Sequence, residues 1–192
     1  MKGMNKSGLD SLGYRESYKI DLVNNKKEAL LINVLSIVVL VIMALLIPLF
    51  FKTGLIQFKK EDYFLSVVFF ILSMILYIPL HEIVHGITLK CFTDERIKFG
   101  WKFVYAYCGS KEAVVKPKEY FLVALSPLLV FSLIFIALMA INRELSLLWY
   151  IMEIMNVSGS LGDIYVTFRL WKDRDNDVLV SDSGTDMTIW SR

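Results

Sequence analysis

Long apolar stretches alternate with short polar segments along this chain of 192 residues. Four stretches reach the length of roughly 20 apolar residues that a membrane-crossing helix needs. They lie at 29–51, 63–89, 120–142 and 145–171. The first and third contain no charged residue, whereas the fourth contains Glu153, Asp163 and Arg169. The pattern predicts an all-α multi-pass membrane protein with four transmembrane helices.

The segment between the second and third stretches has a shorter period. Apolar residues occupy every second position over 97–107, which is typical of a β-strand. A Gly-Ser turn at 109–110 and a returning strand at 113–115 would complete a small β-hairpin on the cytoplasmic side of the membrane. An aromatic belt at the interface, without fixed strand pairing, would give the same alternation.

The C-terminal tail, 172–192, repeats this pattern more weakly. We expect strands at 178–180 and 187–190, joined by a turn at Ser183-Gly184.

Composition agrees with a membrane protein. Apolar residues make up 56% of the chain and the mean hydropathy is +0.54, more apolar surface than a soluble domain of 22.1 kDa can bury. The net charge of +2 is too small to indicate nucleic-acid binding. We expect a single membrane-embedded domain over residues 1–192. Its partners would be the lipid bilayer and a peptide or membrane-protein substrate, and the pattern does not indicate an oligomeric state.

Lys and Arg predict the orientation in the cell membrane. The N-terminal segment, the loop after the second stretch, and the tail counted together with Arg169 at the end of the fourth stretch carry 17 of them. The opposite loops carry only Lys52, Lys59, Lys60 and Arg143. Because positive residues are enriched on the cytoplasmic side, both termini should face the cytoplasm. Cys91 and Cys108 would then lie on the reducing side, where we expect no disulfide.

The only two histidines form the sequence His81-Glu82-Ile83-Val84-His85. Residues four apart lie on one face of a helix, so both imidazoles can bind a single zinc ion, and Glu82 can reach a water on that ion. Polar groups are costly inside a membrane span, which argues for a shared purpose. The alternative is a polar cluster that only hydrogen-bonds to neighbouring helices.

A catalytic zinc site needs a third protein ligand, which here should be a carboxylate because there is no other histidine. Cys91 and Cys108 are an alternative that their spacing does not favour. Asp163 lies 18 residues after the start of the fourth stretch, and His81 lies 18 residues after the start of the second, so both should lie at one depth. Glu153 would lie about 15 Å away along the axis, and we interpret it as a polar contact between helices. The other candidates are Asp94, Glu95, Glu112 and Glu119.

The residues before Asp163 have a pattern of their own. Asn156, Gly159 and Asp163 would form one helical stripe. Small residues at 159, 160 and 162 would let this helix approach the histidine helix closely. Asn156 could then donate a hydrogen bond to a substrate carbonyl or oxyanion. The alternative is a helix-packing motif in which Asp163 caps a loop.

Five segments resemble a bacterial family of zincin membrane peptidases over roughly 60–185: His81–Gly86, Tyr105–Cys108, Leu125–Pro127, Ser158–Asp163 and Val180–Asp182. More distantly they are similar to site-2 proteases, which pair an H-E-x-x-H helix with an aspartate on a later span. The resemblance implies zinc (Zn2+) bound by His81, His85 and Asp163, with Glu82 as general base. Where site-2 proteases have Leu-Asp-Gly, this chain has Leu161-Gly162-Asp163.

We therefore expect a zinc metallopeptidase that cleaves membrane-associated substrates. The first alternative is a non-catalytic membrane partner or regulatory protein with a structural or degenerate zinc site. The second is a metal transporter, although four spans without an inverted repeat do not favour it.

Overall fold

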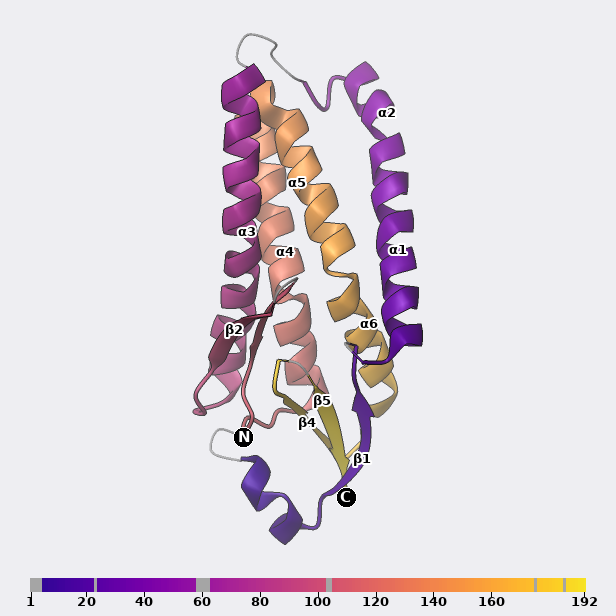
Figure 1. Cartoon of the computed structure of the whole chain (residues 1–192), viewed down its shortest axis with the longest axis vertical. Coiled ribbons are helices and arrows are strands. Elements are labelled where there is room, and N and C mark those ends of the chain that lie inside the picture. Colours follow the sequence, from indigo (N-terminus) through magenta and orange to yellow (C-terminus); the bar gives the residue numbers. More distant parts are fainter. Residues whose placement is uncertain (1–4, 23, 58–62, 103–104, 175, 185) are drawn as a thin grey trace. The chain divides into compact units, whose positions relative to one another are not determined.

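The computed structural model describes residues 5–22, 24–57, 63–102, 105–174, 176–184 and 186–192. Lys59, Lys60 and Phe103 lie outside the described residues. The helices are α1 (Lys26–Leu45), α2 (Ile47–Lys52), α3 (Tyr63–Phe92), α4 (Pro117–Ile141), α5 (Ser146–Gly159) and α6 (Leu161–Leu170) (Figure 1). The strands are β1 (Arg15–Ile20), β2 (Lys98–Lys102), β3 (Tyr105–Gly109), β4 (Val178–Asp182) and β5 (Met187–Ser191).

The chain divides into two compact units. The first comprises Met1–Leu30, Pro79–Pro127 and Gly162–Arg192, and it contains the five strands named above. The second comprises Leu31–Ile78 and Leu128–Leu161, and its described regular structure is helical.

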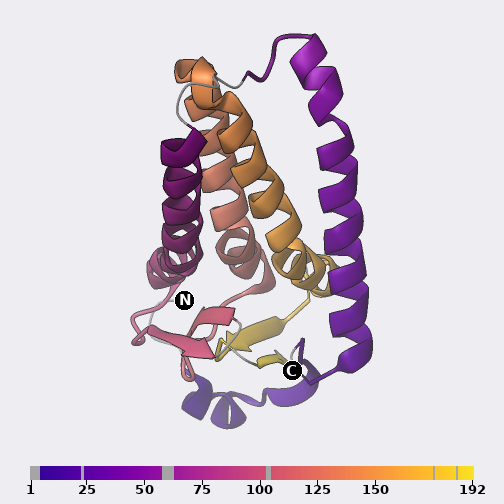
Figure 2. The ribbon, with the colours of Figure 1, turned by 45° about the horizontal axis from the view of Figure 1, so that its top comes forward.

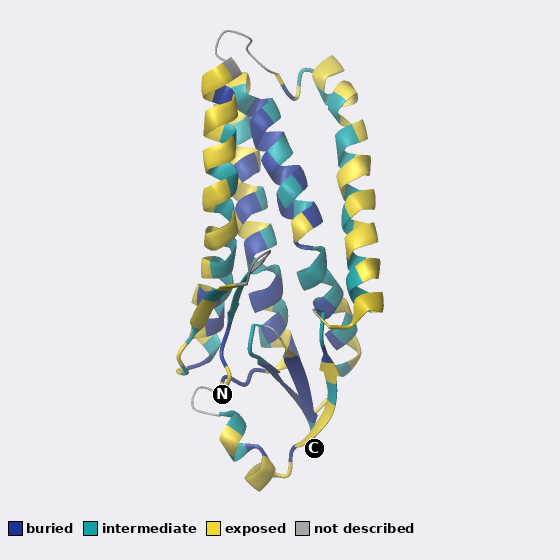
Figure 3. Ribbon diagram, viewed as in Figure 1, coloured by how far each residue is buried: buried dark blue, intermediate teal, exposed yellow. Residues whose placement is uncertain are grey.

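In the part of the chain that the structure describes, three segments are long and apolar enough to cross a membrane: Lys26–Lys52, Phe64–Phe92 and Pro117–Ile141. The first of them has the exposed apolar surface that is compatible with a bilayer. None of the 20 residues of α1 is buried, although most are Leu, Ile and Val (Figure 3). In water this surface would be strongly unfavourable, whereas hydrocarbon accommodates it at no cost.

The predicted fourth span consists of two consecutive helices. α5 has 14 residues and α6 has 10, and Ser160 lies between them. The Ser160 N–H bonds to the Asn156 carbonyl at 3.0 Å and closes α5. The expectation that Asn156 and Asp163 share one helical stripe is therefore wrong, because they belong to different helices.

The close approach expected at the small residues is not found at the two glycines, whereas Ser160 is fully buried. A Cβ atom added to Gly159 would have no neighbour within 4 Å among the atoms that the structure describes. One added to Gly162 would meet only Leu22, at 3.9 Å.

The segment between α3 and α4 does form a hairpin, but with a different turn. β2 pairs antiparallel with β3, from Lys98 opposite Gly109 to Lys102 opposite Tyr105. The predicted turn at 109–110 is wrong, because alternation alone cannot distinguish one long strand from two short strands around a turn. Val115 instead pairs with Val180, with both N–H···O distances below 3.0 Å.

A three-stranded sheet in the order β1-β5-β4 completes the first unit (Figure 2). The predicted tail hairpin is confirmed, with Gly184 at a φ of +86° in its turn. β1 was not predicted, although Tyr18, Ile20 and Leu22 alternate in the sequence and pack into the core. That core gathers buried residues from the sheet, α3, α4 and α6: Ile20, Leu89, Val115, Tyr120, Val123, Ala124, Val166, Leu170, Val178, Val180, Met187 and Ile189.

Candidate metal centre

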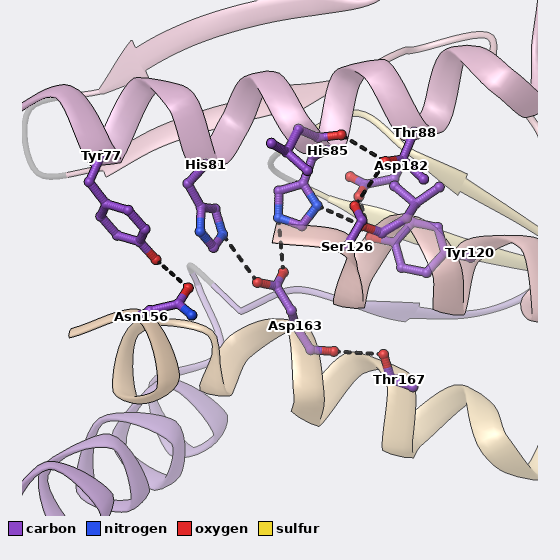
Figure 4. Close-up of polar contacts among 12 residues, drawn as sticks. Tyr77, His81, His85, Thr88, Tyr120, Ser126, Asn156, Asp163, Thr167 and Asp182 are labelled. Carbon is purple, nitrogen blue, oxygen red and sulfur yellow. Dashed lines mark hydrogen bonds and ion pairs between the residues drawn. The ribbon is translucent and has the colours of Figure 1, made fainter. Parts of the chain in front are cut away.

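The first unit brings His81, His85 and Asp163 together (Figure 4). Both histidines project from one face of α3, one turn apart, and Asp163 lies in the first turn of α6. Asp163 Oδ2 is 3.5 Å from His81 Nε2, and its Oδ1 is 3.5 Å from His85 Nε2. The depth that we counted along two separate stretches thus predicted the partner of the histidines.

These three residues fit a zinc ion. Two ligand atoms that each lie about 2.1 Å from a tetrahedral ion are separated by about 3.4 Å, close to both observed distances. Within the described part of the chain, they form the one group of at least three His, Cys, Asp or Glu residues close enough to hold a metal. Two imidazoles and a carboxylate are a ligand set that catalytic zinc sites use, and the group among the described residues has these three members.

A backbone carbonyl orients His85. The His85 Nδ1–H donates to the Val123 carbonyl of α4 at 2.9 Å. This bond leaves Nε2, the atom that faces Asp163, as the nitrogen with the free lone pair. The His81 and His85 rings lie 4.9 Å apart at an interplanar angle of 75°.

Glu82 faces the hairpin between α3 and α4. Its carboxylate lies against the backbone N–H of Cys108 in β3. Gly86, one turn further along α3, makes this approach possible, because a Cβ there would lie 2.5 Å from the Phe99 ring and 3.1 Å from the Cys108 sulfur. Burial raises the pKa of the Cys108 thiol to about 12, and the carboxylates of Glu82 and Asp182 add to the effect.

Asp182, at the end of β4, is a second acid close to this group. Its Oδ2 accepts a hydrogen bond from the Tyr120 hydroxyl at 2.5 Å, and its Oδ1 accepts one from the Gly184 N–H at 2.7 Å. Burial raises the pKa of Asp182, and these two hydrogen bonds partly offset the rise. Among the described residues, Asp163 and not Asp182 belongs to the group close enough to hold a metal, and Asp163 is the acid that faces the histidines.

Asn156 belongs to the second unit and is fully buried. Its amide nitrogen donates to the Leu128 carbonyl at 3.1 Å and to the Ser132 hydroxyl at 3.0 Å, and its oxygen accepts from the Tyr77 hydroxyl at 2.9 Å. A role at an oxyanion stays a prediction, and it would require the amide to exchange one of these bonds.

The other acids have separate roles. Glu153 accepts a hydrogen bond from Ser132 of α4 at 2.7 Å, which confirms it as a polar contact between helices. Glu119 accepts the Lys116 N–H at 2.8 Å at the start of α4.

The sequence comparison extends this picture. A model of the family described as "Putative zincin peptidase" matches residues 74–178, more than half of the chain. The chain belongs to this family. The match includes both histidines, Glu82 and Asp163, and the description of the family indicates a zinc peptidase. No curated protein and no solved structure matches the chain.

Sequence reasoning missed three groups around the histidines. The Val123 carbonyl and the Cys108 N–H are backbone atoms, which carry no residue signature. Tyr120, which holds Asp182, occupies one apolar-looking position within a long apolar stretch.

Proposed function

We propose that this protein is a zinc-dependent peptidase that cleaves membrane-associated substrates, similar in its chemistry to site-2 proteases. The observation that carries the proposal is the Asp163 carboxylate, whose two oxygens face the two histidines of a helix able to cross a membrane. Two histidines with a glutamate next to one of them, and a third ligand from a distant part of the chain, are typical of zinc hydrolases. We therefore favour hydrolysis over metal storage.

Each residue has a definite task in this reaction. His81, His85 and Asp163 would hold the ion, which when bound polarises the scissile carbonyl and acidifies water. Glu82 takes the proton from the attacking water as the new C–O bond forms. It then passes that proton to the amide nitrogen as the C–N bond breaks. The Cys108 N–H limits the orientations open to the Glu82 carboxylate.

The substrate must present an extended backbone, because a helix hides its carbonyls in internal hydrogen bonds. β2 offers an edge for such a segment: among the described residues it pairs with β3 alone. Phe99 and Trp101 on β2 are 54% and 60% exposed. We propose that a substrate strand adds to this edge by backbone pairing, beside the hairpin contact with Glu82.

Sheet pairing supports four membrane crossings with both termini in the cytoplasm. β1 precedes the first span and β5 ends near the C-terminus, yet their backbones are hydrogen-bonded to each other. Two paired strands must lie on the same side of a bilayer, which requires an even number of crossings between them. The α5–α6 pair would then make the fourth crossing, and the excess of Lys and Arg assigns the shared side to the cytoplasm.

Replacing Glu82 with Gln tests catalysis directly. The variant keeps the size of the side chain and removes the base, so zinc should stay bound while turnover falls by about 10²–10⁴-fold. Glu153→Gln is the matched control, since it makes the same chemical change at an acid that bonds to Ser132. Zinc content is measured by elemental analysis. Activity is measured by the membrane proteins that accumulate in a deletion strain carrying each variant.

The alternative of a non-catalytic partner makes the opposite prediction. If Glu82→Gln restores the deletion strain as fully as the wild type does, and no membrane protein accumulates, the peptidase proposal is wrong.

A further inference from the structure

Pro127 interrupts the hydrogen bonds of α4 next to the metal centre. In a helix, the N–H of residue 127 would bond to the carbonyl of Val123, four positions earlier. Proline has no N–H, and its ring pushes that carbonyl aside. Pro127 is fully buried, and α4 continues on both sides of it, from Pro117 to Ile141. The helix thus leaves one carbonyl without its usual donor in the interior of the protein.

The released carbonyl is used by two side chains. The His85 Nδ1–H donates to it from α3 at 2.9 Å, and the Ser126 hydroxyl donates to it at 2.9 Å. The Thr88 hydroxyl of α3 lies 2.9 Å from both the Ser126 hydroxyl and the Val84 carbonyl, and its single proton can be donated to either. Val123 is only 4% exposed, which leaves little room for water to satisfy the oxygen. Because a carbonyl has two lone pairs, these two donors fill its capacity.

We propose that Pro127 is a positioning residue for the metal centre: it keeps the Val123 carbonyl available so that this oxygen fixes the tautomer and ring orientation of His85. The inference rests on the proposed function, in which His85 is a zinc ligand. A ligating histidine usually donates its other ring N–H to a carboxylate or carbonyl, and loss of such a partner costs about 10–100-fold in metal affinity. Here the partner exists because a proline lies four residues after it.

A set of three variants tests this relationship. Pro127→Ala restores a backbone N–H, so three donors compete for two lone pairs and the His85 bond weakens. Ser126→Ala removes one donor and leaves the His85 bond in place. In the double variant, the restored backbone N–H and the His85 ring N–H are again two donors for two lone pairs. Zinc affinity, measured by competition with a chelator on the purified chain, should fall about 10–100-fold in Pro127→Ala. It should stay near the wild-type value in Ser126→Ala and recover substantially in the double variant.

The Nδ1–H proton of His85, observed by NMR, tests the proposal without an activity measurement. The chain has only two histidines, so ¹⁵N-histidine labelling gives two imidazole signal sets, which a His81→Asn variant assigns. The Nδ1–H proton of His85 should be observable and slow to exchange in the wild type and in Ser126→Ala. It should be lost by fast exchange in Pro127→Ala. A purely structural defect would not be repaired by deleting the Ser126 hydroxyl.

Each outcome decides between the two proposals. A wild-type chain that binds no zinc overturns both. Stoichiometric zinc in the wild type, with unchanged affinity and an unchanged Nδ1–H signal in Pro127→Ala, overturns the role of Pro127 and leaves the zinc site standing. If Pro127→Ala loses its helical circular dichroism, Pro127→Gly takes its place, because glycine restores the same N–H and has the least restricted backbone. Unchanged affinity in that variant overturns the role equally.

Discussion

The Glu82 carboxylate lies against the backbone N–H of Cys108, which connects the helix of the two histidines to the hairpin between α3 and α4. The contact depends on Gly86 of α3, where the Phe99 ring comes within 2.5 Å of a would-be Cβ. Glu82, the general base that we propose, is therefore oriented by its contact with β3. A shift of the hairpin would change the orientation of the Glu82 carboxylate.

Gly86→Ala should move the hairpin away from α3. The added methyl group overlaps the Phe99 ring and presses on the Cys108 sulfur, so we expect a loss of roughly 1–3 kcal/mol in the free energy of unfolding. Thermal unfolding of the purified protein measures this loss. Adding Phe99→Ala to Gly86→Ala removes the main obstacle and should restore most of the stability. A double variant no more stable than Gly86→Ala would show that the ring contact is not the cause.

Asp163→Asn and Asp182→Asn form a matched pair of changes in two neighbouring acids. Asp163 faces both histidines, whereas both oxygens of Asp182 accept other hydrogen bonds. We expect Asp163→Asn to lose nearly all bound zinc and Asp182→Asn to retain about one zinc per chain, the stoichiometry of a single catalytic site. Elemental analysis distinguishes them. Equal zinc content in the two variants would remove Asp163 from the ligand set.

Local signals in the sequence predicted the parts of the site that depend on local geometry. His81, Glu82 and His85 follow directly from helical spacing. Asp163 followed from counting residues along two stretches, on the expectation that both begin at the same face of a bilayer. The hairpin turn could not be located in this way, since residues 103–107 are all apolar and carry no turn signal.

The remaining parts depend on contacts between distant segments. The Val123 side chain carries no chemistry, and the role of its carbonyl emerges only when Pro127 and His85 are seen together. The break at Ser160 is indicated by the Gly159-Ser160 pair, yet the surrounding apolar run favours a continuous span. β1 is largely exposed, and its pairing with β5 joins opposite ends of the chain.

Alkaline pH should weaken the sheet through Tyr18. Its hydroxyl donates to Asp173 at 2.7 Å, and burial together with this bond raises the pKa of Tyr18 above its ordinary value of 10.0. The folded form thus favours the neutral phenol. The contribution to stability is complete below pH 10 and is lost as the pH rises toward the folded-state pKa. Unfolding measured between about pH 8 and 11.5 should show a smaller decline in Tyr18→Phe than in the wild type. Parallel declines would contradict this role.

The two cysteines should differ in reactivity. Cys91 is exposed, whereas Cys108 is half-buried and its raised pKa of about 12 leaves little thiolate at pH 8. A maleimide should label Cys91 rapidly and Cys108 only after denaturation, with Cys91→Ser as the control that isolates the slow site. In Glu82→Gln one nearby negative charge is removed, so the pKa of Cys108 falls and its labelling should become faster. Equal rates in the wild type and Glu82→Gln would show that Glu82 does not act on this thiol.

The side of the membrane reached by the C-terminus distinguishes three crossings from four. Within the described residues, three helices are long enough to span on their own. The proposed topology has four crossings, because β1 and β5 are paired and an odd number would separate them. Reporter fusions at Lys6 and at Arg192 should therefore both give cytoplasmic signals, and an insertion after Asn142 should give an external one. Replacing Lys172 and Arg174 with Gln is the control for orientation by charge, and it should leave the C-terminus inside because the β1–β5 pairing is retained. A cytoplasmic signal at Lys6 with an external one at Arg192 would exclude the fourth crossing by α5 and α6.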